Sequence, residues 1–535
     1  QIYGRVLEPE TAPMTASFEI CQSQDRRNGL SWRSVAWLML SDIVGTSVLT
    51  FSGVTNKLGW LLTIVFIVGL FPVSLYVSVL MVRTRTMLVS MAEMRARPPP
   101  KVSTMGEVAG AAFNSPTAKT IVEVLVYGYT FLGQASYLLV LGTSYQQTFY
   151  MQHICLTVAV AVGCALLVVP LSVIREMSES VMLCLFNTVL IAVVIILALA
   201  AISEDSSRDT PVTHLIAPSL TFPALLGAAT NMVYSFAGQW MYFEIMDTMA
   251  VPSQFPQAFL ISGPFMVITY LVVALVGYML GATESDLVSS VPKGPMLQAL
   301  AAMLFAHVAI VYGLKSLVLA RYLHAQCSAE NMKSRSPGSY LLHSVCTTGM
   351  LAVGYAIANA VPFFSQLLGL IGGLFAGPIN FILPLALYLV TLVRYEGQLA
   401  GTSDPLVEDD RSSPMSSSLP SPSQRQFGSQ GQGSHPKSCE EPEEEMDTAA
   451  GESEDTEAAE NDSSSNSSAT SSRSQVSVSL SKLCRAVPAW EMIFMLAILT
   501  FIILTMIVGV KDQIQAIIDL DNQFGEPFSC HALAR

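Results

Sequence analysis

The sequence predicts an all-α integral membrane protein that crosses the bilayer about eleven times. Of its 535 residues, 52% are hydrophobic and only 13% are charged, whereas charged residues make up about a quarter of an average soluble domain. The apolar residues form runs long enough to cross a hydrocarbon core about 30 Å thick, which takes about 20 residues of helix. The acidic residues behind the net charge of −13 gather largely in one Ser-rich tract, Glu440 to Asp462.

Polar or charged interruptions separate the predicted spans. In chain order the spans are Ser34–Gly53, Leu61–Val82, Thr120–Tyr145, Thr157–Val173, Val181–Ile202, Phe222–Met249, Phe259–Leu280, Leu297–Ala320, Tyr340–Ala360, Gln366–Val393 and Ala489–Val510. They predict a cytosolic tail (1–33), a transmembrane core of ten spans (34–393), a linker (394–487), an eleventh span (488–511) and an extracytosolic tail (512–535). The Ser- and Glu-rich linker has the composition of a disordered segment, and its composition names no partner.

Basic residues follow alternate spans, which predicts the orientation of the chain. They are Arg83, Arg85, Arg95, Arg97, Lys101, Arg175, Arg321, Lys333, Arg335, Lys482 and Arg485. The opposite loops carry mostly acids, such as Glu204, Asp205 and Glu284. By the positive-inside rule, the N-terminal tail and the linker are expected in the cytosol. The membrane is expected to be the plasma membrane or that of an acidic organelle.

Two predicted spans contain polar or glycine-rich interruptions at their centres. The first reads Ser-Asp-Ile-Val-Gly-Thr-Ser over Ser41–Ser47, and the sixth reads Tyr-Ser-Phe-Ala-Gly-Gln over Tyr234–Gln239. Either glycine alone, Gly45 or Gly238, is explained by close helix packing. Discontinuous helices at corresponding positions of two halves favour instead a five-plus-five inverted repeat, with a substrate site near the bilayer midplane.

Both interrupted spans, together with part of the eighth span, also resemble the amino acid/auxin permease family. The similarity lies in Ser235–Met246 of the sixth span, in Asp42 and Val44–Thr46 of the first, and in Lys315 and Val318–Arg321 of the eighth. The resemblance implies the LeuT-type fold of the amino acid-polyamine-organocation superfamily. It also implies amino acid uptake coupled to protons or, in some members, to sodium. Ser47 departs from the family pattern, which usually has a second glycine there.

The chemistry of a zwitterion predicts which residues bind it. Backbone N–H groups and the positive end of a half-helix suit an α-carboxylate, and freed carbonyl oxygens suit an α-ammonium. Ordinary helix packing explains the two aromatic side chains equally well. The candidate substrate-binding residues are Val44, Gly45, Thr46, Ser47, Ser235, Phe236, Ala237, Gly238 and Trp240.

Three ionisable residues, Asp42, Glu244 and Lys315, lie inside predicted spans, where a charge costs about 2.5–3.5 kcal/mol. We expect them to couple ion movement to transport, protons being favoured over sodium. For Glu244, a structural role in fixing the broken helix is equally open. Lys315 is expected to take the place of a bound sodium ion with Asp42 as its partner, although its long stem would also let it snorkel to the interface. His307 is explained by a hydrogen bond between helices.

Other functions are disfavoured by what the sequence lacks. No H-E-x-x-H or G-x-S-x-G motif is present, so no enzyme is expected. The nine cysteines show neither metal-ligand spacing nor a disulfide framework, and neither a cofactor nor a nucleic-acid partner is expected. The alternative to a proton-coupled amino acid symporter is an amino acid sensor that signals through the linker.

Overall fold

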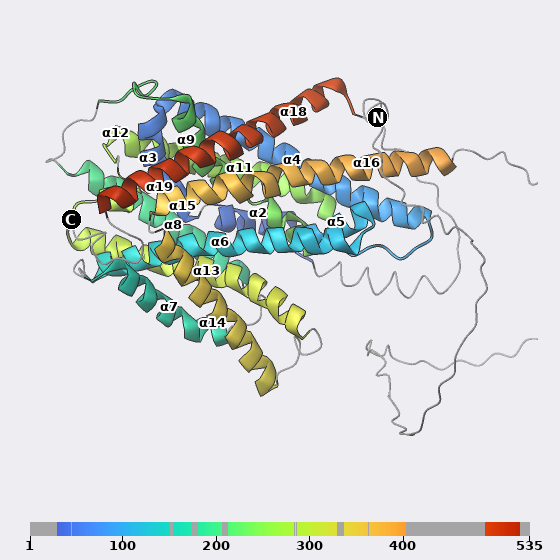
Figure 1. The fold of residues 1–535 in the computed structure, drawn as a ribbon, viewed down its shortest axis with the longest axis horizontal. Coiled ribbons are helices and arrows are strands. Elements are labelled where there is room, and N and C mark those ends of the chain that lie inside the picture. Colours follow the sequence, from blue (N-terminus) through green and yellow to red (C-terminus); the bar gives the residue numbers. More distant parts are fainter. Residues whose placement is uncertain are drawn as a thin grey trace, which may run out of the picture. The chain divides into compact units, whose positions relative to one another are not determined.

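The computed structural model describes residues 29–43, 45–149, 154–173, 180–205, 212–282, 284, 286–328, 336–361, 363–402 and 487–524. All of them belong to one compact unit, residues 1–402 and 478–535, while the second unit, residues 403–477, lies outside the described ranges. Within those ranges the chain is helical (Figure 1), apart from loops and one isolated bridge between Leu30 and Met249.

Nine helices in the described part of the chain are long and apolar enough to cross a membrane. They are Trp60–Met94, Pro116–Thr148, Leu156–Val173, Leu183–Ser203, Pro252–Met279, Pro295–His324, Pro337–Ala360, Phe364–Leu399 and Ala489–Asp519. They correspond to the second to fifth and the seventh to eleventh predicted spans. The first and sixth spans are each divided into shorter helices. The prediction of an all-α, multi-pass membrane protein with broken first and sixth helices is therefore confirmed.

The order of elements places one broken segment at the start of each group of five spans. The first group comprises α2 (Trp32–Ile43), η1 (Thr46–Thr50), α3 (Phe51–Leu58), α4 (Trp60–Met94), α6 (Pro116–Thr148), α7 (Leu156–Val173) and α8 (Ser180–Ser203). The second comprises α9 (Phe222–Ser235), η2 (Gln239–Met241), α10 (Tyr242–Asp247), α11 (Phe255–Leu271), η4 (Val272–Val276), α12 (Gly277–Met279), α13 (Pro295–Cys327), α14 (Pro337–Ala360), α15 (Phe364–Ile371), η6 (Gly372–Ala376), η7 (Pro378–Ile382) and α16 (Leu383–Thr402). This order is the one expected of a five-plus-five repeat.

The last span is α18 (Ala489–Leu504), η8 (Thr505–Gly509) and α19 (Val510–Phe524). The sequence placed the end of this span at residue 511, but the helix continues to Phe524 because its later part is amphipathic and packs on α9. Gln513, which is buried, donates a hydrogen bond to the carbonyl of Gly227 in α9 at 2.6 Å. The tenth span likewise runs past residue 393, to Thr402.

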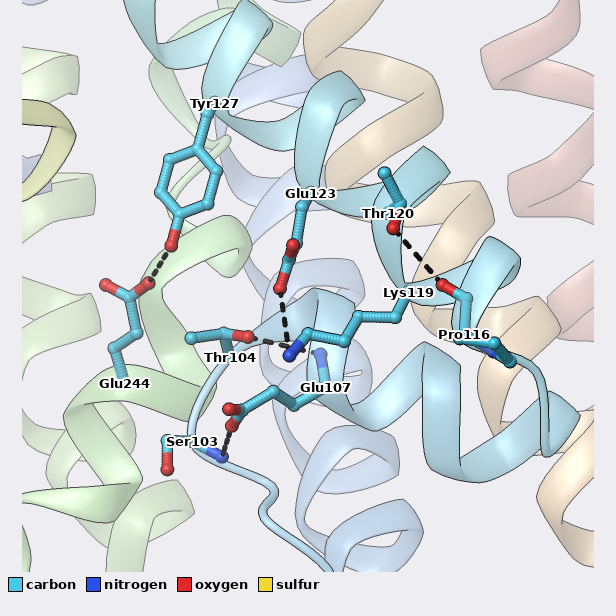
Figure 2. Close-up of polar contacts among 9 residues, drawn as sticks. All are labelled: Ser103, Thr104, Glu107, Pro116, Lys119, Thr120, Glu123, Tyr127 and Glu244. Carbon is cyan, nitrogen blue, oxygen red and sulfur yellow. Dashed lines mark hydrogen bonds and ion pairs between the residues drawn. The ribbon is translucent and has the colours of Figure 1, made fainter. Parts of the chain in front are cut away.

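A short helix not expected from the apolar runs, α5 (Met105–Phe113), precedes the third span. A variant of the capping box fixes its start. The hydroxyl of the N-cap residue Thr104 accepts from the Glu107 amide at 3.1 Å, and the Glu107 carboxylate accepts from the amide of Ser103, one residue before the N-cap, at 3.0 Å. Figure 2 shows this box beside the first turns of α6. The loop between α4 and α6 therefore ends in an ordered helix that packs on α6.

Helices α6 and α13 make the most extensive contact between elements in the described unit. Polar and aromatic pairs run along their shared face. The Ser316 hydroxyl donates to Gln134 at 2.9 Å, Lys315 meets Tyr137, and the ring of Tyr322 stacks on that of Tyr127 at 3.8 Å. These contacts hold α6 and α13 together as one side of the candidate site.

Candidate functional site

The first break lies between α2 and η1. Gly45 adopts an extended conformation, with φ −99° and ψ −167°, and the chain turns there into the tighter helix η1. The amide of Val48 donates to the Gly45 carbonyl at 3.4 Å, and the Thr50 hydroxyl donates to the Ser47 carbonyl at 2.8 Å. A helix thus begins again directly after the break, with its first amides facing the interruption.

The second break lies between α9 and η2. The Phe236 amide donates the last α-helical hydrogen bond of α9, to the Met232 carbonyl at 3.1 Å. The α-helical hydrogen-bond pattern stops after it. The Trp240 amide donates outside its own segment, to the side-chain oxygen of Asn380 in η7 at 2.9 Å. Asn380 is fully buried and also donates to the carbonyl of Ala376 at 3.0 Å. One side chain of the tenth span therefore supports the restart of the sixth.

The carbonyl groups at the second break meet tyrosine hydroxyls. Tyr270 donates to the Ser235 carbonyl at 2.8 Å, and Tyr129 donates to the Ala237 carbonyl at 3.4 Å. A carbonyl oxygen has two lone pairs, so each can accept a second hydrogen bond. The break is thus stabilised from α11 and α6 while its oxygens keep the capacity to bind a donor.

A cavity lies where the two breaks meet. It is lined by Gly45, Ser47, Tyr129, Tyr137, Tyr234, Ser235, Ala237, Gly238 and Lys315. Six of the residues singled out from the sequence are in this lining: two from the first break, three from the second, and Lys315. The geometry therefore brings together the centres of the first, third, sixth and eighth spans.

Other predicted residues lie elsewhere. Thr46 is buried outside the lining, and Phe236 packs edge-on against Tyr270 with ring centroids 5.3 Å apart. Trp240 is buried too, and its backbone amide donates to the side chain of Asn380. Val44 lies outside the described residues, and the Asp42 side chain lies outside the described side chains.

Lys315 brings a cationic group to the cavity. Its Nζ donates to the Tyr137 hydroxyl at 3.2 Å and lies 5.4 Å from the centroid of the same ring. The side chain is therefore directed to α6 at the level of the breaks. Its pairing with Asp42 stays a prediction.

Glu244 lies outside the cavity lining, on α10. The Tyr127 hydroxyl of α6 donates to its carboxylate at 3.5 Å, as Figure 2 shows. One turn further, Asp247 pairs with Arg85 of α4 at 3.1 Å. Short helix α10 is thus held to two neighbouring spans by its two carboxylates. Whether Glu244 has a coupling or a structural role stays a prediction.

His307 is fully buried, and its Nδ1 lies 3.3 Å from the Asn187 carbonyl of α8. This is the bond between helices that was expected of it. The three tyrosines of the lining were not predicted. Tyr129 and Tyr137 are two turns apart on α6, and Gly133 lies between them. Because glycine has no Cβ, the Tyr234 hydroxyl can approach at this point; a Cβ added at Gly133 would lie only 3.1 Å from it. A glycine flanked by tyrosines within a span was the available signal.

The family model for transmembrane amino acid transporter proteins matches residues 28–396, more than half of the chain. The chain belongs to this family. The match includes both broken segments and the cavity they form, and it confirms the resemblance seen in the motifs of the first, sixth and eighth spans.

Several relatives of the transporter family align with parts of the chain. The amino acid transporter AVT1D of Arabidopsis thaliana is 24% identical over 373 residues, which are 67% of this chain and 63% of that protein. The amino acid transporter AVT1B of the same plant is 25% identical over 308 residues, 55% of this chain and 54% of that protein. An N amino acid transport system protein of Neurospora crassa is 26% identical over 164 residues, 30% of this chain and 35% of that protein. The chain thus spans less than two thirds of each of these relatives.

Among solved structures, a mutant of the manganese transporter of Eremococcus coleocola matches 75% of this chain and 92% of its own, with 13% identity and a TM-score of 0.39. A complex of the same transporter with an aromatic bis-isothiourea compound matches equal shares of the two chains, with 14% identity and a TM-score of 0.32.

Proposed function

We propose that the protein is a secondary active transporter that carries amino acids by proton-coupled symport. The observation that carries the proposal is the cavity between the two broken helices, whose lining combines backbone groups of both breaks with the Lys315 side chain. Membership of the transmembrane amino acid transporter family and relatives named as amino acid transporters support the substrate class.

The cavity chemistry suits a zwitterion. The residues from Gly45 to Ser47 begin a helix at the first break, where amide groups and the helix dipole attract an α-carboxylate. Ser235 and Ala237 line the cavity from the second break, and their carbonyl oxygens, which each accept from one tyrosine hydroxyl, can accept a further hydrogen bond from an α-ammonium. Binding both ends of one ligand would draw the two broken helices together, which is how occupancy favours a closed state over an open one.

The coupling ion is a proton in this proposal, and Asp42, Glu244 and Lys315 are the candidate carriers. Residues 34–393 and the last span form the transport unit, and residues 394–487 form a cytosolic linker. A proton gradient directed into the cytosol exists across the plasma membrane and across the membrane of an acidic organelle, so either location supplies the driving force.

Reconstitution into proteoliposomes tests the proposal. Purified protein should accumulate a radiolabelled amino acid from a competition panel against its gradient, and a protonophore should reduce accumulation to the level of empty vesicles. Saturable amino acid binding without any uptake would contradict transport. That result would support instead an amino acid sensor acting through the linker.

A further inference from the structure

The final part of α16 carries two side chains that bond to backbone carbonyl groups of other helices. Arg394 Nη1 donates to the carbonyl of Ala111 at 2.8 Å and also to that of Ala112, both at the end of α5. Further along α16, the Gln398 amide donates to the carbonyl of Met91, in the last turn of α4, at 3.1 Å. The end of the tenth span is therefore tied to the ends of α4 and α5, at one end of the helix bundle (Figure 1).

The bond from Arg394 caps α5. The last carbonyls of an α-helix have no amide partner in their own helix, and they carry the negative end of the helix dipole. The chain leaves α5 through Asn114, which has a left-handed conformation with φ 51°. The partly buried Arg394 supplies a positive charge and N–H donors to two of these carbonyls. A side chain of another span thus completes the end of α5.

Helix α5 supports the part of α6 that contacts α10. Gly106 of α5 lies so close to α6 that a Cβ added there would overlap the Glu123 side chain. Figure 2 shows Glu123 and Tyr127 on the same face of α6, with α5 beside it. One turn after Glu123, the Tyr127 hydroxyl donates to Glu244 of α10 at 3.5 Å. A movement of α5 would therefore disturb the face of α6 that holds α10.

Helix α10 covers one side of the central cavity. It follows shortly after the cavity-lining Gly238 in the chain, and its Phe243 and Met246 are buried. Asp247 of α10 pairs with Arg85 of α4 at 3.1 Å. The two helices that α16 bonds therefore both hold α10, α4 by direct contact and α5 through α6.

Helix α10 is also joined to the start of the first broken span. The Leu30 amide donates to the Thr248 carbonyl at 2.8 Å, and the Ala250 amide donates to the Leu30 carbonyl at 3.1 Å. Leu30 directly precedes α2, and the two bonds form the parallel bridge between Leu30 and Met249. The halves of the two broken helices on this side, α2 and α10, are thus linked through their backbones.

We propose that Arg394 and Gln398 form a latch that keeps the cavity closed on the side of α2 and α10. While the latch is engaged, α4 and α5 stay in place and α10 keeps its attachments. Release of the latch would free α10 together with α2, and the cavity would open on this side. The proposal rests on the proposed transport function, in which the cavity opens to each side in turn.

The positive-inside rule predicts that the latch lies on the cytosolic side, since Arg95, Arg97 and Lys101 follow α4 directly. Arg394 is therefore a positioning residue, which acts on the cavity through α5, α6 and α10. Its loss should increase access to the cavity from the cytosolic side alone, whereas a general loosening of the fold would increase access from both sides.

Chemical labelling of a cavity position tests the latch without relying on transport. Ser47 lines the cavity, and Ser47→Cys places a thiol there. A membrane-impermeant maleimide is applied to inside-out vesicles, and the peptide that contains position 47 is quantified by mass spectrometry, so that the native cysteines can stay. Adding Arg394→Ala should raise the labelling rate at this position several-fold. In right-side-out vesicles the rate should not rise.

Further variants in the same Ser47→Cys background provide the controls. Arg394→Lys should give a smaller rise, because an ammonium can still donate to a carbonyl but lacks the planar fork. Tyr127→Phe should also raise the rate, because it removes the hydroxyl that bonds to Glu244 and keeps the ring. Arg97→Ala should leave the rate unchanged, since Arg97 is exposed beyond the end of α4.

Two results would overturn the latch. One is an unchanged labelling rate in inside-out vesicles of Arg394→Ala, and the other is an equal rise in both kinds of vesicle. If Arg394→Ala does not reach the membrane, Arg394→Lys and Tyr127→Phe decide by the same criteria. Wild-type uptake is measured separately, so that absent uptake counts against the transport function and unchanged labelling counts against the latch.

Discussion

At the scale of single residues, Lys315 is the side chain to which we assign ion coupling. Its ammonium group lies at the cavity against Tyr137, inside a span where a charge costs about 2.5–3.5 kcal/mol. We propose that this ammonium takes the position of a coupling metal ion, and a change in its protonation would alter the contact between α13 and α6 beside the cavity. We therefore propose that ion coupling depends on this side chain.

Replacement of Lys315 tests this role. If protons drive the transport as proposed, wild-type uptake should be independent of sodium and should rise as the external pH falls. Lys315→Ala should remove that pH dependence. Lys119→Ala is the matched control, since Lys119 is half-exposed on α6, pairs with Glu123 at 3.7 Å and lies outside the cavity. Sodium-driven uptake by the wild type, or an unchanged pH profile in Lys315→Ala, would refute the assignment.

Asn380 is the residue that supports the second break from outside. Asn380→Ala would leave the buried Trp240 amide without its acceptor, which costs about 1–3 kcal/mol. We therefore expect a lower unfolding temperature and a loss of uptake. Asn359→Ala is the control, because Asn359 is also buried and, among the described residues, donates its side-chain hydrogen bond to the carbonyl of Tyr355 in its own helix. Equal losses of uptake in the two variants would show that Asn380 has no special relation to the break.

At the scale of elements, the sequence predicted the two helix breaks, but it did not predict all of the side-chain contacts that stabilise them. A glycine between polar residues is visible in an apolar run, so the centres of the first and sixth spans could be located from Gly45 and Gly238. The contacts of Tyr129 and Tyr270 with the second break depend on which helices become neighbours, and no local pattern encodes that.

The last span is attached to the core at both ends. Near its start, Glu491 accepts from Arg83 at 3.1 Å and from the Tyr76 hydroxyl at 3.0 Å, both on α4. Near its end, Gln513 bonds to Gly227 of α9. The helix that follows the linker is therefore packed against both a continuous span and the first half of a broken one.

Glu491→Gln tests the attachment to α4. The Glu491 carboxylate is buried but Arg83 is 52% exposed, so solvent screening limits the expected loss to about 1 kcal/mol. Thermal unfolding in detergent measures it. Glu123→Gln is the control, because its pair with Lys119 lies within one helix at 3.7 Å and should contribute at most about 0.5 kcal/mol. A larger loss in Glu123→Gln than in Glu491→Gln would contradict the attachment.

At the scale of the whole molecule, the Ser- and Glu-rich segment is predicted to be separate from transport. It lies outside the described residues, and the prediction rests on its Ser- and Glu-rich composition, which is poor in the apolar residues that a folded core requires. Deletion of Gly428 to Ser472 should therefore leave the KM for uptake unchanged, as measured from initial rates in proteoliposomes. A large rise in KM would show that the segment contributes to the substrate site.

The central claim is that the meeting point of the two broken helices is the transport site. The most direct test is the initial rate of radiolabelled amino acid uptake by Gly238→Leu, measured beside wild type at equal surface expression. Gly238 lines the cavity, whereas Gly349 in α14 has open space around it, so Gly349→Leu controls for the added side chain. The account predicts that Gly238→Leu loses uptake and that Gly349→Leu retains it. Normal uptake kinetics in Gly238→Leu would contradict the account.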